Sequence, residues 1–492
     1  DLSVSERAIA TGNTDKLKPN QRRREPPEKP KVYGPGMAVT DAGSTTQQQA
    51  IEPPRFRMTP RRIAMSLDRT RSAELWDELG AAARDEGVAR FRFMGDTCWV
   101  VTDPAWVRQA LTSPPDLVGR STSFRKLRII LGDSLLTTEG PAHRMRRRQM
   151  QPAFHRERLE AYATSIVDAA KATDQEWRAG TTVHMDRDMA ALTMDAIGSA
   201  VLGVDGRALA PSIGRALEQL MRAMPIMFVP GIEWLADKPL PGMGWLRRAI
   251  DHLDAVARAG AETSEAELVK SLRTAVEDLP QLSQEDVRDE LLTLLMAGHE
   301  TTAVTLTWLW WLLDRHPDVG ARLGAEIADV VGDRDPTYDD VARLHYTQAV
   351  VAETLRLRPA AWINEREVTG DLAFGPYRPK RGDLLLIPTW VVQRDARWWS
   401  EPEEFRPERW LDADGRYDEK APGQPRGAYL PFGAGAHACI GQAFAWTEAV
   451  LALAVLVPNW RPTLAPDARV GIRASVTMRP AHGMPMVLNA RS

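Results

Sequence analysis

The chain has 492 residues, and its 63 Lys and Arg side chains nearly balance its 66 Asp and Glu side chains, for a formal net charge of −3. This balance argues against a nucleic-acid-binding protein, which would normally carry a basic excess, and the 43% hydrophobic content is that of a globular protein. Two cysteines, Cys98 and Cys439, exclude a disulfide-stapled secreted scaffold and favour a reducing, cytoplasmic compartment.

The first residues differ in composition from the rest of the chain. Residues 1–55 are poor in aromatic side chains and rich in Pro, Gln, Thr and charged residues, and such a segment cannot bury enough surface to offset its ordering entropy. We therefore predict a disordered N-terminal extension, part of which could precede a native start at Met37. It has no apolar stretch like that of a signal peptide, and its basic run at 22–24 could instead be a docking arm.

Amphipathic patterns of helical period continue from residue 56 without a linker or repeat, and they predict one large, mainly α-helical domain with small β-sheets over 56–492. Helices are expected at 142–178, 186–203, 210–223, 246–260, 265–275, 284–315, 317–331 and 346–357. Strands are expected at 88–93, 98–102, 384–388, 476–478 and 484–488. The aperiodic segment Pro225–Pro241 could be a surface lid or a packed connection.

The most informative helical pattern is at 291–313, where 23 residues carry a single formal charge, that of Glu300. This length would span a bilayer, but an ionisable side chain near the middle costs on the order of a few kcal/mol in lipid. Ser283 and the acidic residues after it form a helix start signal, and Pro317 follows the end of the pattern. We therefore predict a buried core helix about 48 Å long and no membrane span.

Two features of this helix suggest chemistry. Gly298 costs about 1 kcal/mol relative to Ala in a helix interior, so the pair Ala297-Gly298 suggests that another group approaches the helix backbone closely. The carboxyl group of Glu300 beside the hydroxyl of Thr301 can pass a proton from solvent to a reacting centre. Alternatively, the acid only caps or pairs within the core.

A glycine-rich loop contains the second cysteine. Residues 431–441 read Pro-Phe-Gly-Ala-Gly-Ala-His-Ala-Cys-Ile-Gly and precede an apolar helix expected at 442–457. Gly433 and Gly435 permit positive φ and let the backbone pass close to a bulky flat group. A helix N-terminus lowers the pKa of a nearby thiol, so Cys439 is a good candidate axial ligand for haem iron. No Cys-x-x-Cys-His occurs, which excludes c-type attachment, and Cys98 is expected to be a core residue.

Three further segments accompany this loop in the chain: Ala297-Gly298-His299-Glu300-Thr301-Thr302, Glu353-x-x-Arg356 and Pro407-Glu408-Arg409-Trp410. Together with Phe432-Gly433-x-Gly435-x-His437-x-Cys439-x-Gly441, they resemble, in order and approximate spacing, the motifs of the cytochrome P450 superfamily of haem-thiolate monooxygenases, in its soluble bacterial type. The resemblance covers about residue 56 to the end of the sequence. It implies the cytochrome P450 fold, mainly α with small sheets around a buried haem.

The resemblance also implies a cofactor and its ligands. The cofactor would be haem b (iron protoporphyrin IX), with the Cys439 thiolate as axial ligand. Residues implied to contact it are His143, Arg147, Ala297, Gly298, Arg366, Phe432, Gly433, His437 and Gly441, of which His143, Arg147, Arg366 and His437 would hold the propionates. The family more often has Arg than His at 437. Because histidine titrates near neutrality, we expect haem retention to weaken as the pH rises through the pKa of His437.

Glu353 and Arg356 are three residues apart on a predicted helix, so they share a face and can pair. Alone, such a pair is usually a surface ion pair worth a few tenths of a kcal/mol, on the order of thermal energy. The resemblance implies instead that Glu353, Arg356 and Arg409 form a structural triad that holds the cysteine loop without reacting.

Basic residues near the start of the helix predicted at 142–178 suggest a surface on which an electron-donor protein docks. The resemblance implies that an acidic donor docks at Arg144, Arg146 and Arg148, although these could simply be a solvated helix face. Because no flavin or ferredoxin domain follows Cys439 in the sequence, we expect electrons from a separate ferredoxin or flavodoxin with its NAD(P)H reductase.

The implied reaction is insertion of one atom of O2 into a hydrophobic small molecule, by hydroxylation or epoxidation, with Glu300 and Thr301 managing proton delivery. The implied pocket residues are small or apolar, which suits a bulky apolar substrate: Ala360, Ala361, Trp362, Ile363 and Val476. The Ala-Gly-x-Glu-Thr-Thr form is similar to that of fatty-acid- and terpenoid-oxidising members. Alternatives are a peroxide-driven oxygenase on the same fold, a non-catalytic haem sensor, or a membrane protein built around 291–313.

Overall fold

The computed structural model describes residues 51–68, 70–203, 206–227, 244–278 and 282–491, and these belong to one compact unit. The predicted N-terminal extension lies outside the described residues except at 51–55. That short stretch packs against the first strand: Pro53 is buried, and the carbonyl oxygen of Pro54 accepts a hydrogen bond of 2.8 Å from the backbone N–H of Arg90. Most of Pro225–Pro241, for which the sequence allows either a surface lid or a packed connection, also lies outside the described residues.

The longest helix, α13 (Gln284–Arg315), has 32 residues, and its bounds confirm the helix predicted at 284–315. A capping box starts it, because the backbone N–H and the hydroxyl of Ser283 both donate to Asp286 Oδ2, at 2.7 and 2.8 Å. Most of its side chains are buried. Among the described residues, no helix is both long and apolar enough to cross a membrane.

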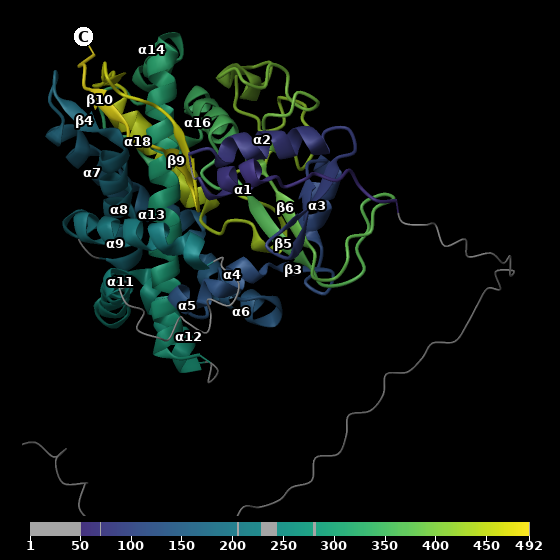
Figure 1. Cartoon of the computed structure of the whole chain (residues 1–492). Coiled ribbons are helices and arrows are strands. Elements are labelled where there is room, and N and C mark those ends of the chain that lie inside the picture. The colour runs from purple at the N-terminus through teal and green to yellow at the C-terminus, as the bar shows by residue number, and fades with distance from the viewer. Residues whose placement is uncertain (1–50, 69, 204–205, 228–243, 279–281, 492) are drawn as a thin grey trace, which may run out of the picture. The chain divides into compact units, whose positions relative to one another are not determined.

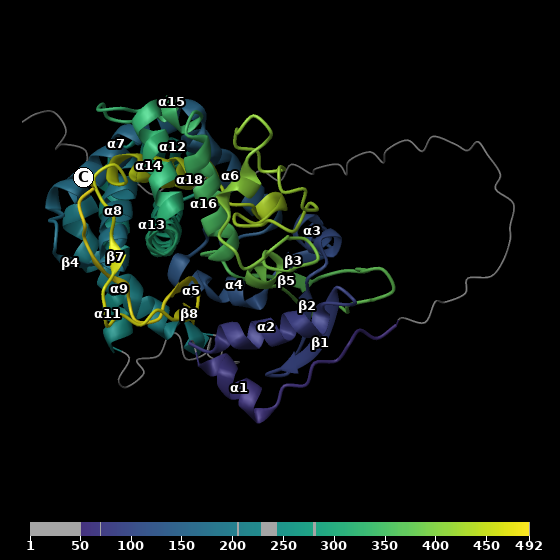
Figure 2. The ribbon, with the colours of Figure 1, turned by 90° about the horizontal axis from the view of Figure 1, so that it is seen from above.

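Helices surround α13, and the largest sheet lies to one side of it (Figure 1 and Figure 2). The helices that contact α13 are α5 (Arg128–Leu131), α8 (Met185–Ile197), α11 (Gly244–Thr263), α12 (Glu267–Asp278), α14 (Pro317–Val330), α16 (His345–Leu357) and α18 (Gln442–Leu456). Other helices are α1 (Pro60–Leu67), α2 (Ser72–Ala83), α3 (Pro104–Thr112), α4 (Thr122–Lys126), α6 (Gly140–Met150), α7 (Arg156–Glu176), α9 (Gly206–Met227), α15 (Tyr338–Val341) and α17 (Thr389–Val392).

Two predicted helices are interrupted. The prediction of one helix over 142–178 is wrong, because α6 ends at Met150, a 3-10 turn covers Gln151–Phe154, and α7 begins at Arg156. Pro152 in this turn cannot donate a helical hydrogen bond, which explains the break. The helix predicted at 186–203 is α8 followed by a π-helical turn at Gly198–Leu202, which ends at Gly203 in the left-handed region, φ 62°.

The largest sheet has five strands in the order β1-β2-β6-β5-β3. They are β1 (Val88–Phe93), β2 (Asp96–Val101), β6 (Leu384–Ile387), β5 (Asn364–Val368) and β3 (Val118–Arg120). Strands β2 and β6 pair in parallel, and the other neighbours are antiparallel. The strands predicted at 88–93, 98–102 and 384–388 therefore exist, whereas β3 and β5 were not predicted.

Two small sheets lie in the C-terminal region. One contains β4 (Thr182–His184), β10 (Pro485–Val487) and β7 (Thr463–Leu464), and the other is the hairpin of β8 (Ile472–Ala474) and β9 (Met478–Pro480). The strand predicted at 476–478 is wrong, because residues 475–477 form the turn of this hairpin. Val476 thus sits at the tip of a turn with its side chain exposed.

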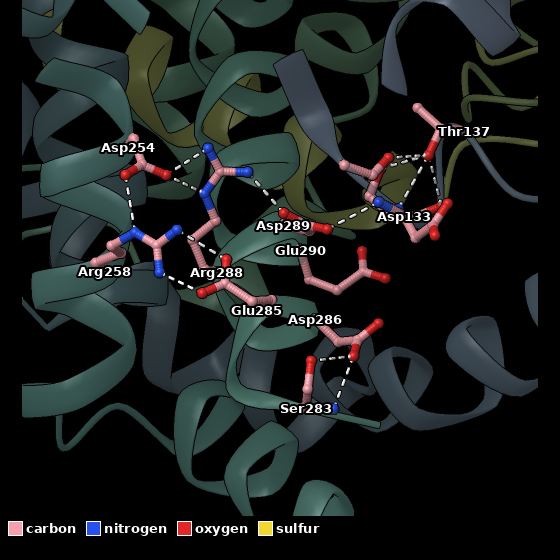
Figure 3. A network of polar contacts seen from close by, with 12 residues as sticks. Asp133, Thr137, Asp254, Arg258, Ser283, Glu285, Asp286, Arg288, Asp289 and Glu290 are labelled. Atoms are coloured by element: carbon pink, nitrogen blue, oxygen red, sulfur yellow. Dashed lines mark hydrogen bonds and ion pairs between the residues drawn. The ribbon is translucent and has the colours of Figure 1, made fainter. Parts of the chain in front are cut away.

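A polar network joins the N-terminal half of α13 to two neighbouring segments (Figure 3). Arg288 pairs with Asp254 of α11, and its Nη1 donates to Asp289 Oδ1 at 2.6 Å. On the other side, Asp289 Oδ2 accepts the backbone N–H of Asp133 at 2.8 Å. Gly132, with φ 56°, makes this approach possible, since a Cβ there would lie 1.9 Å from Asp289 Oδ2. The network therefore holds α11 and the connection between α5 and α6 against α13.

Candidate active site

The cysteine loop leads directly into α18 and depends on two glycines. Gly433 and Gly435 have φ of 68° and 74°, in the left-handed region. A Cβ on Gly435 would also lie 2.3 Å from the carbonyl oxygen of Leu111 in α3, so only glycine fits there. The backbone N–H of Cys439 donates to the carbonyl oxygen of Phe432 at 2.9 Å, which closes the loop and fixes the cysteine.

Cys439 has an accessible side chain although protein surrounds it. The residue is exposed, yet burial of the thiol among protein atoms raises its pKa, opposed by the Gly441 N–H and by the charge of Arg147. The backbone N–H of Gly441, just before α18 begins at Gln442, lowers this pKa as predicted, but burial outweighs it and the net shift is upward. A Cβ on Gly441 would lie 4.0 Å from Cys439 Sγ, an ordinary van der Waals contact, so Gly441 lies beside the sulfur.

Cationic groups gather beside the cysteine loop. The rings of His143 on α6 and His437 have centroids 4.1 Å apart, and Arg147 Nη1 donates to the carbonyl oxygen of Ala438 at 2.8 Å. Arg366 on β5 is buried and lies directly opposite Arg120 of β3 in the sheet register. Four residues predicted from the motifs are thus brought together, and the buried Arg120 joins them.

The positive charges in this cluster repel one another and lower each other's pKa. Burial and the nearby Arg366 lower the pKa of Arg120 to about 9, with Glu139 opposing the shift. Burial, with the charge of Arg120 next, lowers the pKa of His143 to about 4 and that of His437 to about 2. A cluster of cationic side chains that depress each other's pKa is suited to an anionic group. The residues present therefore fit a ligand that carries carboxylates.

The low pKa of His437 is that of the protein alone, in which this histidine is neutral near pH 7 and the positive charge of the cluster comes from its arginines. Carboxylates placed beside the ring would raise its pKa. The expected weakening of haem retention with rising pH therefore stays a prediction.

The middle of α13 contains the predicted acid and alcohol. Ala297 is exposed although the helix around it is largely buried. The hydroxyl of Thr301 donates to the Ala297 carbonyl oxygen at 2.7 Å. Glu300 Oε1 accepts a hydrogen bond from Thr477 Oγ1 at 2.8 Å and pairs with Arg479 Nη2 at 3.1 Å. The acid thus points to the hairpin of β8 and β9.

Gly298 has a different neighbour from the one predicted. A Cβ at this position would lie 2.1 Å from Cδ1 of Ile197, at the end of α8. The inference that something approaches the helix backbone closely is correct, but the approaching group is a core side chain of another helix. Its assignment as a cofactor contact stays a prediction.

The carboxylate of Glu353 on α16 accepts several hydrogen bonds, three of them from the segment before the cysteine loop. It accepts hydrogen bonds from Arg356 Nε and Nη2 at 2.8 and 2.9 Å and from Arg409 Nε at 3.0 Å. Trp410 Nε1 and the backbone N–H of Arg406 also donate to it, at 2.9 and 3.0 Å. Burial alone would raise the pKa of Glu353, but these bonds and charges outweigh it and hold the pKa below its ordinary value. The three triad residues are all buried and in contact, unlike a surface pair.

A family model described as Cytochrome P450 matches residues 81–473, most of the chain. The chain belongs to the cytochrome P450 family. It is therefore a cytochrome P450 monooxygenase, and membership implies in general a haem with a cysteine thiolate ligand.

Several known P450s are similar to this chain. Cyclooctatin synthase of Streptomyces melanosporofaciens is 35% identical over 72% of this chain and 78% of its own length. Cyclooctat-9-en-7-ol 5-monooxygenase of the same organism is 32% identical over 74% and 80%, and pentalenene oxygenase of Streptomyces avermitilis is 30% identical over 82% and 90%. The crystal structure of the cytochrome P450DA heme domain superposes with a TM-score of 0.77 at 25% identity, covering 90% of this chain and 98% of that one.

The basic residues on α6 of this P450 have two different environments. Arg144 and Arg148 are exposed, as expected for an interaction surface. Arg146 is buried, pairs with Asp286, and its Nη1 lies 3.2 Å from Glu290 Oε1. The prediction that Arg146 belongs to an exposed docking surface is therefore wrong, because the N-terminal acids of α13 draw its guanidinium inward.

The predicted pocket residues of the P450 come from two segments that touch. Trp362 Nε1 donates to the carbonyl oxygen of Ser475 at 2.8 Å, and the Met478 N–H donates to that of Ala360 at 3.1 Å. These bonds bring Ala360–Ile363 beside the turn that carries Val476. Ala361 and Val476 are exposed, Ile363 is half-buried, and Ala360 and Trp362 are buried.

Sequence reasoning missed three residues of this site: Arg120, Thr477 and Arg479. Arg120 lies in a three-residue strand, and only the pairing of β3 with β5 places it beside Arg366. Thr477 and Arg479 lie beside the predicted pocket residue Val476, but nothing in their spacing pointed to Glu300. No motif includes these three residues, and their roles follow from tertiary contacts alone.

Proposed function

We propose that this P450 binds haem b through Cys439 and inserts one atom of O2 into an apolar small molecule of the terpenoid class. One observation carries the proposal: a thiol that is accessible yet surrounded by protein lies on a glycine-dependent loop beside a cluster of cationic side chains. A single ligand with a metal centre and two carboxylates suits both features.

Each part of the site has a role in this function. Arg120, Arg147 and Arg366 supply positive charge for the propionates, and His143 and His437, neutral in the protein alone, supply ring N–H donors. Phe432, Gly433 and Gly441 shape the loop around the sulfur, and Ala297 lines the α13 side. The triad of Glu353, Arg356 and Arg409 holds the segment that leads into the loop.

When bound, haem supplies an iron that activates O2 with two electrons. The protein must then deliver protons and exclude bulk water. Glu300 and Thr301 lie on the helix that spans the core, and both have side chains that can hold and move a proton. We propose that they relay protons from solvent to the reacting centre.

The relatives support the substrate class. Three of them are named for cyclooctatin, cyclooctat-9-en-7-ol and pentalenene, and the predicted pocket residues here are likewise apolar or small. Because an apolar pocket gains free energy in proportion to the apolar surface it covers, a bulky hydrocarbon skeleton with few polar groups is the substrate that suits Trp362, Ile363 and Val476 best.

Electrons would come from NAD(P)H through a separate ferredoxin or flavodoxin and its reductase. The exposed Arg144 and Arg148 project from the same helix as His143 and Arg147, so a donor docked on them would lie near the proposed haem. Positive side chains at this face favour an acidic donor. Salt would then slow association.

The test of the cofactor site is the absorption spectrum of the reduced protein with carbon monoxide. We expect a strongly red-shifted Soret band in the wild type and in Cys98→Ala, whose thiol is buried in β2. Cys439→Ala should lose the shifted band. Retention of the band in Cys439→Ala, or absence of haem from a folded, haem-supplied wild type, would reject the proposed ligand.

The test of the reaction compares electron sources with a bulky terpenoid alkene as probe. The reductase system with O2 should give a product one oxygen atom heavier, labelled from 18O2, and Thr301→Ala should keep the spectrum while diverting electrons to hydrogen peroxide. Product formed with peroxide alone, and none with the reductase system, would instead identify a peroxide-driven oxygenase. Absence of turnover with either would favour a haem sensor.

A further inference from the structure

The carboxylate of Glu300 is held by a hairpin that is far from it in the chain. Thr477 Oγ1 donates to Glu300 Oε1 at 2.8 Å, and Arg479 Nη2 lies 3.1 Å from the same oxygen. Thr477 is buried, and the side chains of Glu300 and Arg479 are 18% and 21% exposed. This degree of burial makes the pair stronger than a surface ion pair.

The hairpin itself is fixed on both sides. On α13, Trp308 Nε1 donates to the Met478 carbonyl oxygen at 2.8 Å, and β9 lies beside that helix (Figure 1). On the other side, Trp362 Nε1 donates to the Ser475 carbonyl oxygen. Between these anchors, Val476 is 44% exposed at the tip of the turn. Val476, a predicted pocket residue, is thus the immediate neighbour of Thr477, which donates a hydrogen bond to the acid.

The local charges leave Arg479 as the partner of the acid. His299, next to Glu300, is buried, which lowers its pKa. Thr301 donates to the backbone of Ala297, so its hydroxyl proton is directed to the helix and away from Glu300. Among the described residues, Nε of Arg479 has no hydrogen-bond partner, and Nη2 pairs with Glu300.

We propose that Arg479 and Thr477 are positioning residues for the proton carrier Glu300, and that they connect proton delivery to substrate contact at Val476. The inference rests on the proposed function. In the productive reaction, substrate, O2, two electrons from NAD(P)H and two protons give the oxygenated product and water. When proton delivery is mistimed, the same electrons and protons convert O2 to hydrogen peroxide and leave the substrate unchanged.

The test measures product and hydrogen peroxide per NAD(P)H consumed in the haem-loaded enzyme. Arg479→Gln should lower the ratio of product to peroxide by about tenfold, as expected when one group of an acid–base pathway loses its position, and should change the solvent isotope effect on product formation. Arg479→Lys, which restores a cation, should recover most of the ratio. Thr477→Val should lower the ratio and Thr477→Ser should retain it.

Arg473→Gln is the matched control. Arg473 lies directly opposite Arg479 in the same hairpin, and its Nη2 donates to the Ala481 carbonyl oxygen at 2.8 Å, with no contact to Glu300. The Arg473→Gln variant should form as much product per NAD(P)H consumed as the wild type does. Substrate affinity, read from the Soret shift on binding, should change little in Arg479→Gln and Arg473→Gln alike.

Three results separate the possibilities. If the wild type forms no product with O2 and the reductase system, the proposed function fails. If the wild type forms product and Arg479→Gln partitions electrons as the wild type does, only this inference fails. If Arg479→Gln binds substrate more weakly or unfolds more easily without any change in the product-to-peroxide ratio, the pair is purely structural and the inference is also overturned.

Discussion

Gly298 and Ile197 meet at the contact of α13 with α8, where a Cβ on the glycine would lie 2.1 Å from Cδ1 of the isoleucine. The absence of a side chain on α13 thus accommodates a core side chain of the neighbouring helix. This packing explains why glycine is tolerated inside the longest helix despite its helix propensity, which is about 1 kcal/mol worse than that of alanine.

The contact predicts non-additive stabilities. Gly298→Ala should lower the free energy of unfolding, since overpacking a core costs about 1–3 kcal/mol and exceeds the gain in helix propensity. Ile197→Val removes the atom in conflict at a cost of about 1 kcal/mol. The double variant should be more stable than the sum of the single effects predicts, by about 1 kcal/mol or more. Denaturant titration of the four proteins measures this, and additive effects would contradict the packing.

Glu353→Gln should destabilise the protein by about 3–5 kcal/mol, because it leaves the buried guanidiniums of Arg356 and Arg409 without their carboxylate. The chain offers a control with the same spacing: Arg71 and Glu74 are three residues apart but largely exposed. Glu74→Gln should cost less than about 1 kcal/mol. Urea unfolding of both variants tests the difference, and equal losses would refute a structural role specific to the buried triad.

Glu448 on α18 predicts a pH-dependent stability. It is fully buried, neither of its carboxyl oxygens accepts a hydrogen bond of good geometry from the described residues, and burial raises its pKa to about 8, with the Thr302 hydroxyl opposing the shift. Between the ordinary value of 4.5 and about 8, the folded state therefore holds a proton that the unfolded state has lost.

Stability should therefore fall as the pH rises through this range, by about 1.4 kcal/mol per pH unit. Glu448→Gln removes the titrating group, so its stability relative to wild type should improve steadily from pH 5 to pH 8. The measurement is the free energy of unfolding at several pH values for both proteins. A difference that does not vary with pH would contradict the raised pKa.

The two kinds of arginine on α6 should respond differently to substitution. Arg146→Met leaves the acids Asp286 and Glu290 without their buried partner and should destabilise the fold by about 3 kcal/mol or more. Arg148→Glu, on the exposed face, should leave stability within about 0.5 kcal/mol and slow reduction by an acidic donor, most strongly at low salt. Thermal unfolding and stopped-flow reduction separate the two effects, and equal reduction rates of Arg148→Glu and the wild type at low salt would exclude this face as the docking surface.

The sequence predicts α13 to the residue because its capping signal, periodicity and Pro317 all agree on the ends. The resemblance to the family's motifs supplies the cysteine loop and the triad, although Glu353 and Arg409 come from distant segments. Where no such motif exists, prediction fails for a residue whose role depends on a distant segment. Arg146 is drawn inward by acids on α13, and Gly298 is required by Ile197 of α8.

Arg120 was missed for the same reason. It lowers the pKa of His437 in the protein alone, but only the pairing of β3 with β5 brings it beside Arg366. Val476 was predicted in a strand, whereas the register of β8 with β9 places it in a turn.

The five-stranded sheet sets an order of assembly during synthesis. Its central pair joins β2, complete at Val101, to β6, which begins at Leu384. At about 5–20 residues per second, a ribosome needs roughly 15 to 60 s to make the chain between them, and for that interval β2 has an unpaired edge. The helices around α8 can pack meanwhile through contacts closer in sequence. Cys439 emerges only after the last strand of this sheet has been made, and α18, which follows it, must still join the main core.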